Sequence, residues 1–255
     1  MKRIFRGFKV LFLFAFFGTG ALIINYFVFP AGKIFVKKEE LRDFYCKVVH
    51  KTWKFFNNLM EKTGVIKILF KNCEQFKNIH GKIIVSNHPS YIDIVILIGS
   101  LPDTICIAKK ELKKNFFMGN IVKSLFLIND ENQEKMLKES ADLLKNGYNI
   151  IIFPTGTRTI EGENLKLHKG AAMLALHTKT DIVPVNIHCD YKFLAKNEKI
   201  YDAGEKPVTY TISVNDTIKI EDFSKQNLTD IQQRNRINSA IKEKISACIP
   251  ALQEN

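Results

Sequence analysis

A histidine and an aspartate five residues apart stand in the stretch Ser86-Asn87-His88-Pro89-Ser90-Tyr91-Ile92-Asp93. The apolar run before it is typical of a buried strand, and Pro89 is typical of the first turn of a helix. We therefore expect Asp93 one turn inside that helix, where side chains lean back toward the N-terminus and His88. A carboxylate within reach of an imidazole fixes its tautomer and stabilises the imidazolium, which suits deprotonation of an alcohol. The spacing alone is equally compatible with a histidine that merely satisfies hydrogen bonds.

A second polar group follows the apolar run 148–153. Gly156 permits a positive φ or a close backbone approach, Thr157 adds a hydroxyl, and Arg158 offers a planar fork of donors that matches a phosphate. Ligands of α/β sheets bind at the carboxyl ends of strands, so this loop is a candidate anion site. A turn with a solvated arginine is the alternative. Lys169, at the start of a small-residue helix, is a candidate second phosphate contact.

The elements that must position these groups alternate between strands and helices, which predicts an α/β domain. Pro184 interrupts one predicted strand and is expected at an edge, a bulge or a site-facing position. We expect a single domain with a mixed, mostly parallel sheet flanked by helices, together with an N-terminal membrane-anchoring helix. The patterns predict strands over 65–70, 82–86, 104–108, 148–153, 182–187 and 208–214, a polar helix-like stretch over 109–124, and amphipathic helices over 131–146 and 230–249.

The first 38 residues differ from the rest. Residues 1–9 carry four cations, and the uncharged segment 10–29 has about the 20 apolar residues that a bilayer crossing needs. A cleaved signal peptide is the alternative, but the apolar part is long and lacks a clear Ala-x-Ala site. The basic flank favours a cytoplasmic N-terminus, and a full span would then put the domain outside the cytoplasm. Scattered cysteines without a Cys-x-x-Cys pair favour a reducing compartment, so we expect shallow attachment to the cytoplasmic face of the cell membrane.

The predicted division is a membrane anchor with basic flank over 1–38, an amphipathic helical segment over 39–64, and the main domain over 65–255. The middle segment interleaves aromatic and basic residues, so it either packs on the domain or lies among lipid headgroups. The net charge of +12 predicts anionic partners, an anionic membrane surface among them. No nucleic-acid-binding motif stands out, so nucleic acid is not expected as a partner. The nearest metal-like group, His177, His188, Cys189 and Asp190, has no familiar ligand spacing, and no metal or cofactor is expected.

The ordered combination of 87–93, 153–158 and Val183-Pro184-Val185 resembles the glycerophospholipid acyltransferase family, and within it the lysophosphatidic acid acyltransferase (1-acylglycerol-3-phosphate O-acyltransferase) branch. The resemblance covers about residues 65–190. It implies that His88 is the general base and that Asp93 orients it. It also implies that the loop around Arg158 binds the acceptor phosphate and that Pro184 belongs to a motif associated with the acyl chain or the donor.

The chain departs from the family pattern in two places. Thr155 replaces the acidic residue of the third motif, and Lys110-Glu111-Leu112 matches the second region only loosely, with Asn129-Asp130 where a basic residue often stands. Loss of a carboxylate changes the charge of the acceptor site. An ornithine-lipid or polyene-type acceptor is therefore an alternative, and a non-catalytic membrane lipid-binding protein is a more distant one.

The sequence thus predicts a membrane-associated O-acyltransferase. It would move a fatty acyl group from an acyl carrier protein or coenzyme A thioester to the hydroxyl of a lysophospholipid, lysophosphatidic acid first. The predicted catalytic residues are His88 and Asp93. The predicted substrate-binding residues are Asn87, Ser90, Lys110, Thr155, Gly156, Thr157, Arg158, Lys169 and Pro184.

Overall fold

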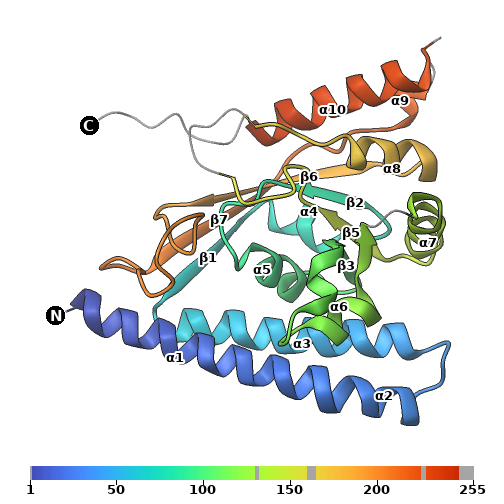
Figure 1. Cartoon of the computed structure of the whole chain (residues 1–255). Helices are drawn as coiled ribbons and strands as arrows, with labels where there is room; N and C mark the ends of the chain where they lie inside the picture. The colour runs from blue at the N-terminus through green and yellow to red at the C-terminus, as the bar shows by residue number, and fades with distance from the viewer. Residues whose placement is uncertain (1, 130–131, 160–164, 225–227, 247–255) are drawn as a thin grey trace, which may run out of the picture.

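The computed structural model describes residues 2–129, 132–159, 165–224 and 228–246. Its centre is a seven-stranded sheet in the order β1-β7-β6-β2-β5-β3-β4 (Figure 1). All neighbouring strands run parallel except β6 and β7, which are antiparallel. The strands are β1 Ile66–Lys71, β2 Ile83–Ser86, β3 Thr104–Lys109, β4 Leu127–Asn129, β5 Asn149–Ile152, β6 Ile182–Cys189 and β7 Val208–Val214. The predicted fold class, an α/β domain with a mixed and mostly parallel sheet, is confirmed.

Helices cover both faces of this sheet. Helices α8 and α10 lie over one face, and α5 and α3 lie over the other (Figure 1). The α-helices are α1 Lys2–Ile23, α2 Phe29–Phe35, α3 Leu41–Lys62, α4 Cys73–Lys77, α5 Asp93–Ser100, α6 Gly119–Leu125, α7 Gln133–Lys145, α8 Gly170–Thr178, α9 Glu221–Ser224 and α10 Asp230–Ser246. A π-helical turn, η1 Ile24–Val28, joins α1 to α2, and η2 Lys110–Lys114 is a 3-10 helix.

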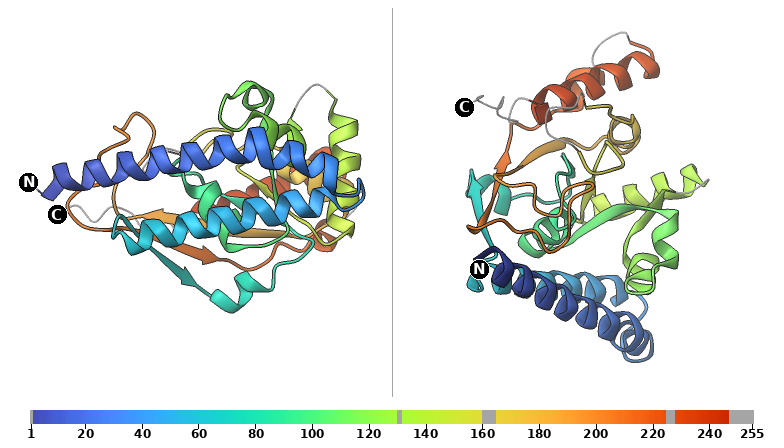
Figure 2. Two further views of the ribbon diagram at one scale, coloured as in Figure 1. Left: turned by 90° about the horizontal axis from the view of Figure 1, so that it is seen from below. Right: turned by 60° about the vertical axis from the view of Figure 1, so that its left-hand side comes forward.

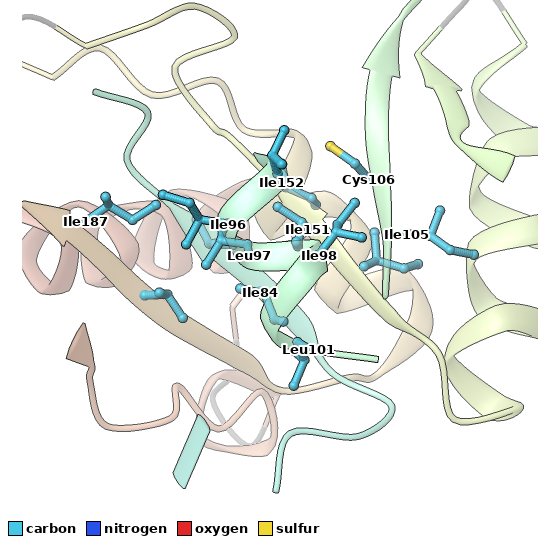
Figure 3. Close-up of a cluster of buried hydrophobic side chains, with 14 of the residues drawn as sticks. Ile84, Ile96, Leu97, Ile98, Leu101, Ile105, Cys106, Ile151, Ile152 and Ile187 are labelled. Atoms are coloured by element: carbon cyan, nitrogen blue, oxygen red, sulfur yellow. The ribbon is translucent and has the colours of Figure 1, made fainter. Parts of the chain in front are cut away.

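The core lies between the central strands and α5. Every residue of β2 and β5 is buried, as expected for inner parallel strands covered on both faces. Figure 3 shows Ile84 and Ile151 of these strands together with Ile96, Leu97 and Ile98 of α5. This packing fixes the carboxyl end of β2 and the start of α5, between which His88 lies.

The predicted polar helix over 109–124 is wrong as a continuous element. It consists of η2 and α6, separated by a turn at Asn115. The side-chain oxygen of Asn115 accepts hydrogen bonds from the backbone N–H groups of Phe117 and Met118. An asparagine that offers the backbone such partners competes with the helix at this point.

Helix α3 packs on the domain, which decides between the two interpretations of segment 39–64. Its buried residues include Tyr45, Val49, Trp53, Phe56 and Met60, which lie on one face of the helix. A Cβ atom at Gly99 of α5 would lie 2.8 Å from the backbone N of Lys54 and 2.9 Å from the backbone C of Trp53. The two helices therefore cross with their backbones in close approach.

The N-terminal helix runs beside α3 in the opposite direction (Figure 2). Residues Lys2–Phe35 form one helix of 34 residues, and it is the one described helix that is long and apolar enough to cross a membrane, by length and composition. Phe17 packs against Phe56 of α3, with ring centroids 4.6 Å apart. At its N-terminal end, Arg6 donates hydrogen bonds to the carbonyl oxygens of Gly64 and Val65. The helix therefore lies along the domain.

Candidate active site

His88 and Asp93 form a hydrogen-bonded pair at the carboxyl end of β2. The Nδ1 atom of His88 lies 2.9 Å from Oδ2 of Asp93. The predicted helix start at Pro89 is wrong: Asp93 is the first residue of α5, and Pro89 lies in the turn before it. Asp93 is completely buried, and it also accepts hydrogen bonds of 2.7 Å from the backbone N–H and the hydroxyl of Ser90. The carboxylate thus holds the proton on Nδ1 of the imidazole. Nε2 makes no hydrogen bond within the described part of the chain, so its lone pair is available to accept a proton.

Asn87 and Ser90, predicted to bind substrate, are engaged with the protein itself. The side chain of Asn87 donates to the carbonyl oxygen of Ile187 at 2.7 Å and accepts from its N–H at 2.8 Å, which joins the end of β2 to β6. Ser90 is buried, and its oxygen accepts a hydrogen bond from the hydroxyl of Tyr210 at 3.1 Å. Both residues therefore orient the backbone and carboxylate that hold His88.

The loop after β5 is tied directly to His88. Phe153 stacks on the imidazole, with ring centroids 4.3 Å apart and planes inclined by 25°. Farther along the loop, the backbone N–H of Thr159 donates to the carbonyl oxygen of His88 at 2.7 Å. Because β2 and β5 are parallel neighbours, the loops that follow them lie side by side at the carboxyl ends of the strands. These loops carry the two sequence motifs.

The turn inside this loop is formed by Gly156 and Thr155, both of which were predicted to bind substrate. Gly156 has φ = +64°, a conformation that favours glycine. The hydroxyl of Thr155 donates to the carbonyl oxygen of Thr157 at 2.8 Å. A carboxylate has no proton to donate to that carbonyl, so Thr155 makes a contact here that an ionised acidic side chain does not make.

Arg158 is held by three groups. Its Nη1 donates to the carbonyl oxygens of Leu194 and Ala195 at 3.0 and 2.7 Å, in the loop that follows β6. Its guanidinium carbon lies 3.6 Å from the centroid of the Tyr91 ring. Nε and Nη2 make no hydrogen bond within the described residues, and these two donors form the edge that can bind a phosphate bidentately.

The remaining three predicted substrate-binding residues, Lys110, Lys169 and Pro184, lie on other elements of the fold. Lys110 begins η2 directly after β3, which flanks β5, and is exposed. Lys169, also exposed, caps α8, and its neighbour His168 donates its backbone N–H to the carbonyl oxygen of Pro154. Pro184 is buried within β6, opposite Val85 of β2 and one residue before the pairing of β6 with β7 begins. Because β6 lies between β7 and β2, Pro184 is not in an edge strand.

Three residues at the site were missed by the sequence analysis: Phe153, Tyr91 and His168. The ring of His168 lies 3.4 Å from a Cβ atom built at Gly156, so it lies beside the turn that Gly156 makes in the loop after β5. Its position next to Lys169 was the one sequence signal available for it. A cavity of about 110 Å³ lies next to the two loops, and its lining includes Asn87, Pro89 and Thr159.

No thiolate nucleophile competes with this arrangement at the described cysteines. Burial raises the pKa of Cys46 and of Cys106 to about 12, and that of Cys189 to about 11. These thiols are protonated at neutral pH and therefore weakly nucleophilic. Among the residues that the structure describes, no three His, Cys, Asp or Glu side chains come together as metal ligands.

A model of the family described as Acyltransferase matches residues 67–188. The chain contains an acyltransferase domain over these residues. That stretch contains the His88–Asp93 pair and the Arg158 loop, so the resemblance drawn from these motifs is confirmed, and so is the predicted class of O-acyltransferase.

Curated relatives of this acyltransferase carry one recurring name. The chain is 29% identical over 173 residues to a 1-acyl-sn-glycerol-3-phosphate acyltransferase of Borreliella burgdorferi, a match that covers 65% of the chain and 68% of that protein. Proteins of the same name from Bacillus subtilis (34%) and Homo sapiens (the beta form, 32%) match 49% and 53% of the chain. The chain spans 64% and 50% of the length of these two relatives.

A solved structure extends the likeness of this acyltransferase to the whole fold. The crystal structure of the 1-acyl-sn-glycerophosphate (LPA) acyltransferase PlsC from Thermotoga maritima superimposes with a TM-score of 0.70 at 22% identity. The match covers 99% of this chain and 100% of that one. The N-terminal helices are therefore part of the shared fold.

Proposed function

We propose that this chain transfers a fatty acyl group from a thioester of acyl carrier protein or coenzyme A to the hydroxyl of lysophosphatidic acid, forming phosphatidic acid. One observation carries the proposal: Asp93 fixes the imidazole of His88 at Nδ1, and Nε2 makes no hydrogen bond to the residues that the structure describes. Thr159, the neighbour of Arg158, donates its N–H to the carbonyl oxygen of His88 and so joins the two loops. A base and an anion-binding edge lie on adjacent loops, as an acceptor with both a hydroxyl and a phosphate requires. The relatives, which are 1-acyl-sn-glycerol-3-phosphate acyltransferases, favour this acceptor.

In the proposed reaction, Nε2 of His88 removes the hydroxyl proton as the acceptor oxygen attacks the thioester carbonyl carbon. Asp93 stabilises the imidazolium that results. The tetrahedral adduct then collapses, the carbon–sulfur bond breaks, and the departing sulfur takes the proton from Nε2. A thioester is reactive enough that no acyl-enzyme is needed, in keeping with the protonated thiols described above.

Three basic side chains are proposed for the acceptor phosphate. Arg158 offers the Nε/Nη2 edge, and Lys110 and Lys169 supply charge from the loops on either side. Thr155 removes one negative charge relative to the acidic residue of the family pattern. This substitution is what keeps an ornithine-lipid or polyene-type acceptor as the second candidate.

We propose that α1 and α2 lie in the cytoplasmic leaflet of the cell membrane rather than crossing it, with 1–38 as the anchor and 65–255 as the catalytic domain. Arg3 and Arg6 hold the N-terminal end of α1 on the domain, through Asp202 and the carbonyl oxygens of Gly64 and Val65. The other side of the helix is apolar and uncovered, which suits a helix lying in the bilayer interface. Its exposed large side chains are Ile4, Phe5, Phe8, Leu11, Phe12, Phe16, Ile23, Tyr26, Phe27, Ile34 and Phe35.

The test is product analysis by mass spectrometry with a labelled acyl thioester. The full chain is offered lysophosphatidic acid, lysophosphatidylcholine and a lyso-ornithine lipid, each with palmitoyl-coenzyme A and with palmitoyl-acyl carrier protein. We expect labelled phosphatidic acid from lysophosphatidic acid. For His88→Ala we expect the rate to fall about 10⁴-fold, as it does when the His–Asp pair of a serine-protease triad is disabled. His80→Ala, at an exposed histidine, is the matched control and should keep its rate. Product from another acceptor alone, or a near-normal rate for His88→Ala, would refute the proposal.

A further inference from the structure

Tyr91 is an exposed aromatic residue in the turn between His88 and Asp93. Its relative exposure is 57%, so core packing does not explain it. Its backbone N–H donates to the carbonyl oxygen of Leu194 at 3.3 Å, and its hydroxyl makes no hydrogen bond within the described part of the chain. Its ring stacks on the guanidinium of Arg158, whose central carbon lies 3.6 Å from the ring centroid.

The groups around Arg158 leave one edge of the guanidinium open. The Tyr91 ring covers a face, and the carbonyl oxygens of Leu194 and Ala195 both take Nη1. The same Leu194 carbonyl therefore binds Arg158 and the backbone of Tyr91. Among the described residues, Nε and Nη2 have no hydrogen-bond partner, and their parallel N–H bonds match two oxygens of a phosphate monoester.

We propose that Tyr91 is a positioning residue that sets where Arg158 holds the acceptor phosphate relative to the base. This inference rests on the function proposed above and deepens it. The hydroxyl and the phosphate of the acceptor are a fixed number of bonds apart. Tyr91 lies in the turn between His88 and Asp93. Its stack on Arg158 therefore fixes the distance between Nε2 of His88 and the Nε/Nη2 edge of Arg158 that binds the phosphate.

The experiment compares steady-state kinetics of Tyr91→Leu, Tyr91→Phe and the parent chain in detergent micelles, with 1-oleoyl-lysophosphatidic acid and palmitoyl-coenzyme A. Loss of a cation–π contact predicts a rise of about 3- to 30-fold in the KM for the acceptor. The KM for the donor should not change, because this proposal assigns the guanidinium to the acceptor phosphate. Tyr91→Phe keeps the ring face and should restore the parent values. Tyr201→Leu, at a tyrosine of similar exposure (48%), is the matched control and should change neither constant.

A double-mutant cycle separates this inference from the function it rests on. Arg158→Ala should raise the acceptor KM strongly, and adding Tyr91→Leu should then raise it no further, because the stacking partner is gone. If Arg158→Ala leaves the acceptor KM unchanged, the phosphate role of Arg158 is wrong. If Arg158→Ala raises it but Tyr91→Leu alone does not, or if donor and acceptor KM rise together, the positioning role of Tyr91 is wrong.

Discussion

The imidazole of His88 rests against the ring of Phe153, with their centroids 4.3 Å apart, while Asp93 holds its Nδ1 edge. Phe153 therefore holds one face of the imidazole ring, and Asp93 at the start of α5 holds its Nδ1 edge. Phe153 follows β5 directly and is half-buried, so it reaches His88 from a rigid strand end. The proposed base is therefore held in position and needs little reorganisation before it accepts a proton.

Replacing Phe153 tests that relationship. In Phe153→Ala the imidazole loses its stacking partner and gains freedom to rotate about the Asp93 hydrogen bond. We expect kcat to fall about 10-fold with both KM values unchanged, since a modest misplacement of a reacting group costs up to about 100-fold. Phe153→Tyr keeps the ring and should stay near the parent kcat. Equal kcat values for Phe153→Ala and the parent chain, measured at saturating substrates, would contradict this role.

Asp93→Asn tests the other support of the ring. The amide is nearly isosteric but carries no charge, so it neither stabilises the imidazolium nor accepts three hydrogen bonds as the carboxylate does. We expect kcat to fall by about 10² to 10⁴, because the equivalent change in a serine-protease triad costs about 10⁴. Circular dichroism should be unchanged. Asp142→Asn, at an exposed carboxylate of α7, serves as control, and a similar kcat for the two variants would exclude the orienting role of Asp93.

Local sequence patterns were sufficient to predict the strand–turn–helix around His88 and the strand before the Arg158 loop. Both depend on short apolar runs, and the loop after the second strand depends also on Gly156, whose conformational preference is intrinsic. The helix start was predicted wrongly, because α5 begins at Asp93 and not at Pro89. The contacts of Phe153 and Tyr91 were not predictable in this way. Phe153 looked like the last residue of an apolar strand, and its partner is decided by strand order, because β5 pairs with β2, which precedes it by more than sixty residues.

The placement of α3 illustrates the same limit. An amphipathic pattern shows that a helix has an apolar face but not what covers that face. The spacing of Trp53 and Phe56 is equally compatible with contact to lipid and with packing on the protein. The structure covers them with α5 and with Phe17 of α1, so the choice depended on tertiary packing.

Gly99→Ala should expose how closely α3 and α5 are packed. The new methyl group would lie within 3 Å of the backbone at Lys54 and Trp53, and backbone atoms cannot move aside as a flexible side chain can. We expect a loss of about 1–3 kcal/mol in the free energy of unfolding, the usual cost of overpacking. Urea denaturation followed by fluorescence of Trp53 measures it. Gly20→Ala, where an added Cβ meets nothing within 4 Å, should be neutral or stabilising, and a loss as large as that of Gly99→Ala would refute the argument.

Asp181 connects the amino ends of β6 and β2, and its contribution to stability should depend on pH. Its Oδ2 accepts hydrogen bonds of 2.9 Å from Lys82 and from Lys219, and Oδ1 accepts one from the backbone N–H of Ile220. Burial acts to raise the pKa of this carboxyl, but the hydrogen bonds from the two lysines outweigh it and lower the pKa below its ordinary value of 3.8. The unfolded chain therefore binds the proton more readily than the folded one.

It follows that Asp181 stabilises the fold above about pH 4, the range in which it is ionised in both states, and that this stabilisation is lost as the pH falls through the lowered folded pKa. At pH 7, Asp181→Asn should reduce the free energy of unfolding by about 1 kcal/mol, because each lysine is partly exposed and its attraction is screened. The gap between variant and parent should close as the pH is lowered from 5 toward 2. Asp216→Asn removes an ion pair whose carboxylate is 89% exposed, and it should show a smaller gap that shrinks in 0.5 M salt. A gap for Asp181→Asn that stays constant from pH 7 to pH 2.5 in urea titrations would show that the carboxylate charge contributes nothing.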